Sequence, residues 1–220
     1  MTTDKKTAIK AVFWDIDGTL IDSEELHYQV IADWCEDYGY PLKKEDNDAL
    51  LGKSMVEKWE ILSAKYPLSS DESTFKDECA SRYCDAVTRD LERGELTSIF
   101  RSVAKTSIPQ VCVSNGDMVV VEANLKVLEL SDLVVFNISG DDVKKGKPDP
   151  EPYLAAAARL GVQPADCLVV EDSLVGVAAG VAAGMTVVAW PEEAGLKDSY
   201  LNADYFVTCA EEFPTHLLNV

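Results

Sequence analysis

The sequence lacks long apolar runs and any recognisable spacing of metal-binding cysteines. No run approaches the roughly 18 apolar residues of a membrane-spanning helix, and segment 1–10 is too polar for a secretory signal. We therefore expect no membrane partner. Six cysteines occur without a CxxC pair, which favours small buried side chains in a reducing compartment and predicts a cytoplasmic protein.

Cationic side chains are also scarce. The 220 residues include 20 Lys and Arg against 39 Asp and Glu, a net charge of -19. Such acidity argues against nucleic acid or an anionic membrane as a partner. The alternative interpretation is that the negative charge only keeps the protein soluble. Any anionic substrate must then be received by individual lysines or by a metal ion.

The most informative stretch is 11–20, AVFWDIDGTL, where an apolar run ends in Asp15, Asp17 and Gly18. Four apolar residues without polar alternation predict a strand covered on both faces, as in a parallel sheet. Two carboxylates at the end of such a strand are costly unless a cation or a reaction requires them. The alternative is a strand followed by an ordinary Asp-Gly turn.

Three further polar groups weaken that alternative because each follows an apolar run or opens a helical stretch. They are Ser114-Asn115-Gly116, Lys147 in the run GKPDP, and Glu171-Asp172. Ligands of parallel α/β sheets bind at the carboxyl ends of the strands. Turn chemistry alone does not explain polar groups at four such places.

The chain divides into two patterns. Residues 22–92 show helical periodicity without a convincing strand, with helices expected at 46–51, 55–66 and 73–91. After residue 93, apolar runs alternate regularly with helical segments, which predicts a parallel sheet covered on both faces. We expect an α/β, Rossmann-like core of residues 1–21 and 93–220, with an inserted all-helical cap domain at 22–92.

These motifs, in this order and spacing, resemble the four motifs of the haloacid dehalogenase superfamily. The matching residues are Asp15-x-Asp17-Gly18-Thr19, Ser114, Lys147 before Pro148, and Glu171-Asp172-Ser173-x-x-Gly176. The resemblance spans nearly the whole chain, and one branch of the superfamily carries a helical cap after the first motif. It is specific for the superfamily and much less specific for a substrate.

The resemblance implies phosphoryl-transfer roles for the core motifs. Asp15 would be the nucleophile that forms an aspartyl-phosphate, and Asp17 the general acid and then base. Ser114 and the main-chain amides of Asn115 and Gly116 would bind the phosphoryl oxygens. Lys147 would offset the charge between Asp15 and the phosphate.

The same resemblance implies a magnesium ion. Asp172 would bind it together with Asp15 and the main-chain carbonyl of Asp17, and Glu171 would ligate it directly or through water. Thr19 either caps the following turn or shapes the site. Members that cleave carbon–halogen bonds lack an acid at the position of Asp17, so dehalogenation is not expected.

Two residues of the helical segment are candidates for substrate contact. His27 matches a histidine that assists proton transfer in the family's β-phosphoglucomutase, although a lone helical histidine is more often a packing residue. Lys53 lies in a loop that resembles the substrate-reading loop of the cap. The mutase carries an arginine where this chain has Met55, which counts against a bisphosphate-handling mutase, although Lys53 could partly replace it.

The leading hypothesis is a Mg²⁺-dependent phosphatase acting on a small phosphomonoester, a sugar phosphate or sugar-acid phosphate. The alternatives are a hexose-phosphate mutase and a non-catalytic binding protein on the same fold. We expect a small phosphorylated metabolite as partner, and a monomer or weak homo-oligomer.

Overall fold

The computed structural model describes residues 9–50, 53–192 and 194–218. The chain forms two compact units, one built from residues up to Asp22 and from Arg89 onward, and one from Ser23–Thr88. The sequence placed these boundaries after residues 21 and 92. Each unit has its own secondary structure and its own buried residues.

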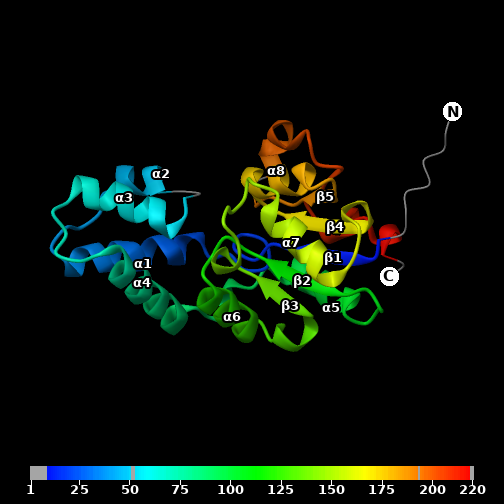
Figure 1. Ribbon diagram of the computed structural model, residues 1–220, viewed down its shortest axis with the longest axis horizontal. Coiled ribbons are helices and arrows are strands. Elements are labelled where there is room, and N and C mark those ends of the chain that lie inside the picture. Colours follow the sequence, from blue (N-terminus) through cyan, green and yellow to red (C-terminus); the bar gives the residue numbers. More distant parts are fainter. Residues whose placement is uncertain (1–8, 51–52, 193, 219–220) are drawn as a thin grey trace. The chain divides into compact units, whose positions relative to one another are not determined.

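The first unit contains a six-stranded parallel sheet of order β3-β2-β1-β4-β5-β6 (Figure 1). The strands are β1 Ala11–Trp14, β2 Gln110–Val113, β3 Phe136–Ile138, β4 Cys167–Glu171, β5 Thr186–Ala189 and β6 Tyr205–Phe206. The chain runs outward from β1 to β3 on one side and from β4 to β6 on the other. The reversal of strand order at β1 and β4 creates the crevice in which ligands bind to such sheets.

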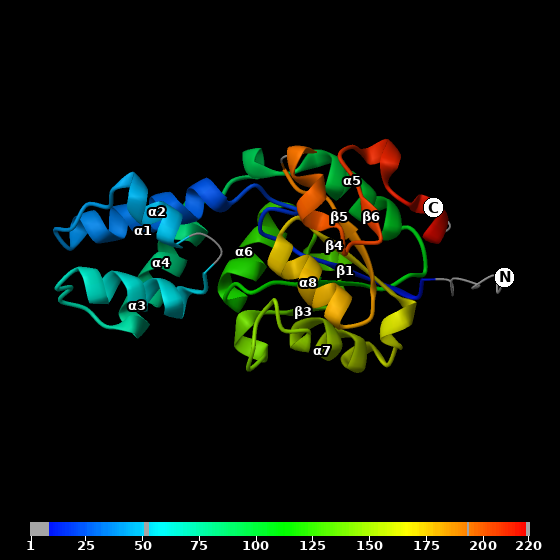
Figure 2. The same ribbon diagram turned by 90° about the horizontal axis from the view of Figure 1, so that it is seen from above.

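Helices cover both faces of this sheet, as the sequence predicts. They are α5 Gly94–Val103, α6 Met118–Val127, α7 Glu151–Leu160 and α8 Leu174–Ala182. Successive side chains of β1 point to opposite faces. Phe13 stacks on Tyr153 of α7, and Trp14 packs against Phe100 of α5, so α5 and α7 lie on opposite sides (Figure 2). The predicted α/β, Rossmann-like core is confirmed.

The regular secondary structure among the described residues of the second unit is all helical. Its helices are α1 Glu24–Asp37, α2 Lys44–Leu50, α3 Met55–Lys65 and α4 Glu72–Ala86. Trp34 and Phe75 meet edge to face at its centre, with ring centroids 4.9 Å apart. The expected helix 73–91 was too long, because Val87 is extended (φ -63°, ψ 130°) and a separate 3-10 turn follows at Arg89–Leu91.

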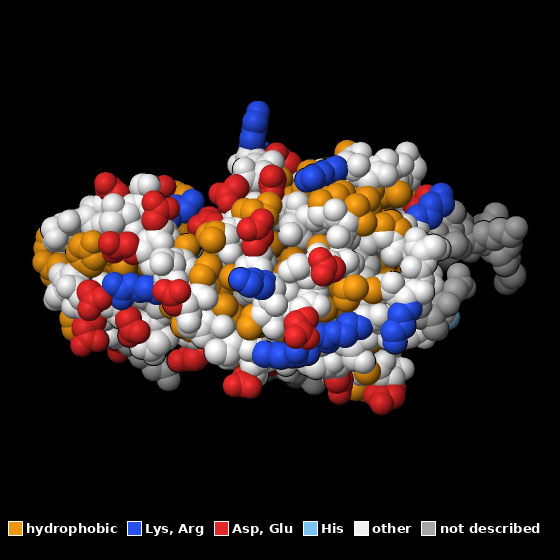
Figure 3. Space-filling view, turned by 90° about the horizontal axis from the view of Figure 1, so that it is seen from below, with side chains coloured by type: hydrophobic (Ala, Val, Ile, Leu, Met, Phe, Trp, Pro, Cys, Tyr) orange, Lys and Arg blue, Asp and Glu red, His pale blue; other side chains and the backbone are white. Residues whose placement is uncertain are grey.

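The acidic side chains on one face of the molecule are dispersed. On the face in Figure 3, Asp and Glu are scattered with Lys and Arg between them, and no broad basic surface is visible. Among the described residues, no helix has the length and apolar character needed to cross a membrane.

Candidate active site

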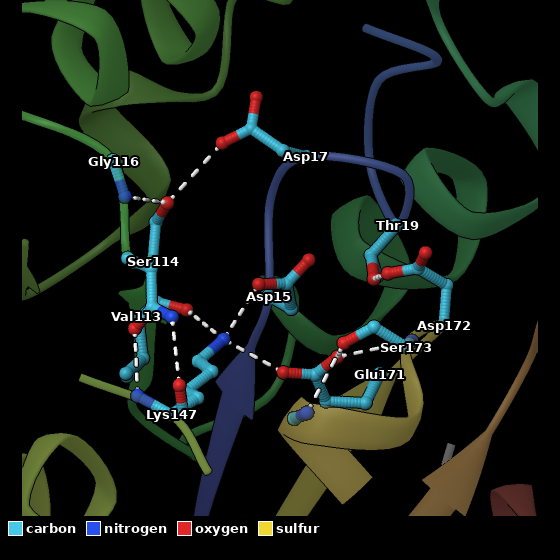
Figure 4. A network of polar contacts seen from close by, with 12 residues as sticks. Asp15, Asp17, Thr19, Val113, Ser114, Gly116, Lys147, Glu171, Asp172 and Ser173 are labelled. Carbon is cyan, nitrogen blue, oxygen red and sulfur yellow. Dashed lines mark hydrogen bonds and ion pairs between the residues drawn. The ribbon is translucent and has the colours of Figure 1, made fainter. Parts of the chain in front are cut away.

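The predicted site residues of the core meet at the carboxyl ends of three adjacent strands. Asp15 follows β1, Ser114 follows β2 and Asp172 follows β4. Because the strands are parallel neighbours in the order β2-β1-β4, these ends lie at one edge of the sheet (Figure 4). Lys147 joins them from the loop that precedes α7.

Lys147 is the buried cation of this site. Its Nζ donates to Asp15 Oδ1 at 2.6 Å, Glu171 Oε1 at 2.7 Å and the Val113 carbonyl at 2.7 Å. Burial alone would lower the pKa of Lys147, but Asp15 and Glu171 outweigh it and hold that pKa above its usual value. The side chain therefore stays charged and satisfies all three of its donor positions.

Glu171, the last residue of β4, is completely buried. Besides Lys147, its Oε1 accepts from the Tyr153 hydroxyl at 2.7 Å, and its Oε2 accepts from the amide and hydroxyl of Ser173. Gly176 leaves the space for it, since a Cβ there would overlap the Glu171 carboxylate. The four donors fix Glu171 against Lys147.

Asp15, which is buried, and Asp172, which is half-buried, lie in an acidic environment. Burial raises the pKa of Asp15 well above its ordinary value and the pKa of Asp172 to about 7. The negative charge of Glu171 is the second largest cause in both cases. Thr19 donates its hydroxyl to Asp172 Oδ1 at 2.7 Å, so its role lies at this acid. Asp15 Oδ2 is buried and has no hydrogen-bond partner.

This donor set suits a hard cation. One carboxylate oxygen from each of Asp15, Glu171 and Asp172 lies within 4.8 Å of the others, and Lys147 is the cation that contacts two of these acids. Mg²⁺ prefers such oxygen ligands, and the unpartnered Oδ2 of Asp15 offers one. The residues present therefore fit the metal that the motifs imply.

Replacing Asp172 with Asn is expected to have opposite effects on stability and activity. The folded carboxyl has a pKa of about 7 against an ordinary 3.8, so the metal-free protein loses stability as pH rises through that window. D172N removes this loss. In EDTA near pH 8 the variant should melt no lower than the wild type, yet it should lose the phosphatase activity that the sequence motifs predict and the Mg²⁺-induced rise in melting temperature.

Thermal unfolding with EDTA and with Mg²⁺, at about pH 5 and about pH 8, checks this expectation. D132N, which changes an exposed acid, is the matched control. A D172N protein that Mg²⁺ stabilises as much as it stabilises the wild type would contradict the assignment of Asp172.

Asp17 lies on the β2 side of the site. Its Oδ2 accepts from the Ser114 hydroxyl at 3.2 Å, and its Oδ1 accepts from Asn124 Nδ2 of α6 at 3.2 Å. The Gly116 amide, expected at a phosphoryl oxygen, donates here to Ser114 Oγ at 2.9 Å (Figure 4). Ser114 thus links the loop after β2 to Asp17.

The side chain of Asn115 clamps the backbone of Lys147. Its Oδ1 accepts from the Lys147 amide at 2.8 Å, and its Nδ2 donates to the Lys147 carbonyl at 3.1 Å. Gly146 permits this approach, because a Cβ there would come within 2.6 Å of Asn115 Oδ1. The sequence had assigned only the main-chain amide of Asn115.

We expect N115A to lower kcat roughly 10-fold and the free energy of unfolding by about 1–2 kcal/mol, since two hydrogen bonds that orient Lys147 are lost. Steady-state kinetics and denaturant unfolding measure both quantities. N202A, at an exposed asparagine, should change neither. Full activity in N115A would show that the clamp is dispensable.

The two candidates of the helical unit lie in different surroundings. The His27 ring of α1 stacks on Tyr83 of α4, with centroids 4.3 Å apart and planes at 19°. Lys53 is exposed, and its Nζ lies 3.9 Å from Glu57 Oε1. Met55 begins α3.

Sequence reasoning missed three residues that contact the site. Tyr153 bonds Glu171, and its ring lies 5.0 Å from Lys147 Nζ. Asn124 bonds Asp17. Arg93 donates to the Gly18 carbonyl, and to that of Trp190 at 3.3 Å. Only Asn124 had a usable signal, as a polar residue on the apolar face of its helix.

Known proteins share the fold of this chain or part of its sequence. The crystal structure of CbbY from Rhodobacter sphaeroides in complex with phosphate superposes with a TM-score of 0.83 and 22% identity, covering 96% of this chain and all of that one. Hexitol phosphatase A of Escherichia coli is 31% identical over 187 residues, 82% of each protein. The bifunctional riboflavin kinase/FMN phosphatase of Arabidopsis thaliana is 29% identical over 205 residues, which are 93% of this chain and 54% of that protein, so the chain spans about half its length.

A family model described as haloacid dehalogenase-like hydrolase matches residues 9–184. The matched range contains every core residue of the site, from Asp15 to Asp172, and the β1-to-β4 sheet that brings them together. With the parallel sheet, the motif order and the family match in agreement, the chain belongs to the haloacid dehalogenase-like hydrolases.

Proposed function

We propose that this hydrolase is a Mg²⁺-dependent phosphatase that cleaves a small phosphomonoester through a phosphorylated Asp15. One observation carries the proposal: Asp15 has one oxygen held by Lys147 and the other buried without a donor. A carboxylate oriented through one oxygen keeps the other for bonding to phosphorus or to a cation. The position at the strand-order reversal provides access for a ligand.

The chain's own groups divide the reaction between them. Asp15 attacks phosphorus while Asp17 gives its proton to the departing ester oxygen, and Asp17 then takes a proton from the water that hydrolyses the phospho-aspartate. Lys147 stays charged in a buried place and offsets the negative charge that gathers at Asp15. Ser114, with the Asn115 and Gly116 amides, would receive the phosphoryl oxygens.

Asp15, Asp172 and the Asp17 carbonyl would hold the magnesium ion. When bound, it supplies charge compensation between the nucleophile and the anionic phosphoryl group. Glu171 has both oxygens occupied by protein donors, so we assign it to holding Lys147 and to contacting the ion through water rather than directly. Asp172 in turn is oriented by Thr19.

For the substrate we propose a sugar phosphate or sugar-acid phosphate, because a relative of nearly equal length is named hexitol phosphatase A. We assign the helical unit to substrate selection as a cap, with His27 and Lys53 as its candidate contacts. The six free cysteines agree with a cytoplasmic location. The partner of the protein would be a small phosphorylated metabolite rather than nucleic acid or a membrane.

A phosphate-release screen over sugar phosphates, with Mg²⁺ and then with EDTA, tests the proposal. We expect turnover only with the metal. Complete inactivity over a broad panel would instead favour a non-catalytic binding protein. Incubation with β-glucose 1-phosphate and a trace of the bisphosphate identifies a mutase, which would yield isomer without free phosphate. Met55 stands where the mutase has an arginine, and its uncharged side chain cannot bind a second phosphate as a cation would, which argues for hydrolysis.

A further inference from the structure

Asn124 is a buried polar residue on an otherwise apolar helix face. Its neighbours on the buried side of α6 are Val120, Val121 and Leu125, and Asn124 itself is completely inaccessible. A buried amide is costly to fold unless its polar atoms are bonded. An apolar residue would suit the packing of this face better, so packing alone does not account for the amide.

The Asn124 amide reaches the acid of the loop after β1. Nδ2 donates to Asp17 Oδ1 at 3.2 Å, while Ser114 Oγ donates to Asp17 Oδ2 at 3.2 Å. Gly116 is close as well, since a Cβ on it would lie 3.6 Å from Asp17 Oδ2. The carboxylate is therefore held at both oxygens by residues of the β2–α6 segment.

We propose that Asn124 is a positioning residue for the proton transfers of Asp17. This inference rests on the proposed phosphatase function. The Asn124 NH₂ group can only donate, so it keeps Oδ1 as an acceptor. The Ser114 hydroxyl beside Oδ2 can either donate or accept, so Oδ2 is the oxygen that carries and releases the proton.

The step that depends on this arrangement is cleavage of the ester. An Asp15 oxygen forms a bond to phosphorus, and the electron pair of the ester P–O bond passes to the leaving oxygen. That oxygen takes the proton from Asp17 Oδ2, which becomes a carboxylate. An ester whose alcohol is a poor leaving group needs this proton, whereas 4-nitrophenolate leaves readily as an anion.

The dependence on the leaving group separates positioning from a general structural role. We compare kcat/KM for phenyl phosphate and 4-nitrophenyl phosphate, two esters of similar shape, in wild type, N124L, D17N and E122Q. The value of kcat/KM depends only on the steps up to and including the first irreversible one. It therefore reports cleavage of the ester rather than hydrolysis of phospho-Asp15. Melting temperatures are recorded for every variant.

In N124L, kcat/KM for phenyl phosphate should fall roughly 10-fold or more, and that for 4-nitrophenyl phosphate less than about 3-fold, within the 10²–10⁴-fold contribution of general acid catalysis. D17N should show the same pattern more strongly. E122Q, at an exposed residue of the same helix, should match the wild type.

An equal fall for both esters in N124L, or no fall in either, would overturn the inference. If N124L does not fold, N124S must show the same selective loss, because its side chain is too short to reach Asp17. A wild type without Mg²⁺-dependent turnover of either ester or of any sugar phosphate in the panel would overturn the proposed function itself, and the inference with it.

Discussion

Replacing Asp15 with Asn is expected to lower kcat by at least about 10⁴-fold in a protein that remains folded. The amide oxygen of the new side chain can still accept from Lys147, but an amide does not attack phosphorus. Burial and Glu171 raise the pKa of Asp15, so its ionised carboxylate destabilises the folded protein. D15N removes this charge and its destabilising effect. Asparagine also occupies nearly the same volume as aspartate.

Phosphate release under saturating Mg²⁺ and substrate measures the loss, and circular dichroism with thermal unfolding checks the fold. D132N is again the matched control, since Asp132 is exposed in the same unit. If D15N kept more than about one hundredth of wild-type kcat, Asp15 would not be the nucleophile.

Replacing Lys147 with Met should damage both stability and activity. The variant leaves the buried carboxylates of Asp15 and Glu171 facing one another without their shared cation. Removing one partner of a buried ion pair costs about 3–5 kcal/mol of unfolding free energy. Loss of an organised charge in an active site lowers kcat by about 10²–10³-fold.

The sign of the pH dependence follows from the charges. Burial raises the pKa of Asp15, and protonation of this carboxyl relieves the unpaired charge in K147M, so the destabilisation of the variant should shrink as pH falls and grow as pH rises. Denaturant unfolding at several pH values measures this. K145M is the matched control, because the Lys145 side chain is 73% exposed and lies 3.7 Å from Asp149.

K145M should change the unfolding free energy by less than about 0.5 kcal/mol and leave kcat unaltered. A K147M protein as stable and as active as K145M would contradict the role of Lys147 as the central cation of the site.

The fold was predictable because its signals are local and repeated. Apolar runs such as β1 and β4, separated by helical periodicity, predict a parallel sheet from the chain alone. Helix ends were less predictable: the expected helix to residue 91 stops at Ala86, because Val87 leaves the helical conformation.

The site was partly predictable for a similar reason. Asp15, Ser114 and Asp172 immediately follow strands, so their meeting is a consequence of strand order. Asn124 and Tyr153 lie within helices, and their contacts with Asp17 and Glu171 depend on how α6 and α7 pack on the sheet. No local pattern encodes that packing.

The covalent intermediate can be tested directly with D17N and 4-nitrophenyl phosphate. This ester needs no acid to leave, whereas hydrolysis of phospho-Asp15 needs Asp17 as base, so the phosphorylated protein should accumulate. Acid-quenched samples, digested and analysed by mass spectrometry, should carry one phosphoryl group on Asp15. Release of one equivalent of nitrophenolate with Asp15 unmodified would contradict the account.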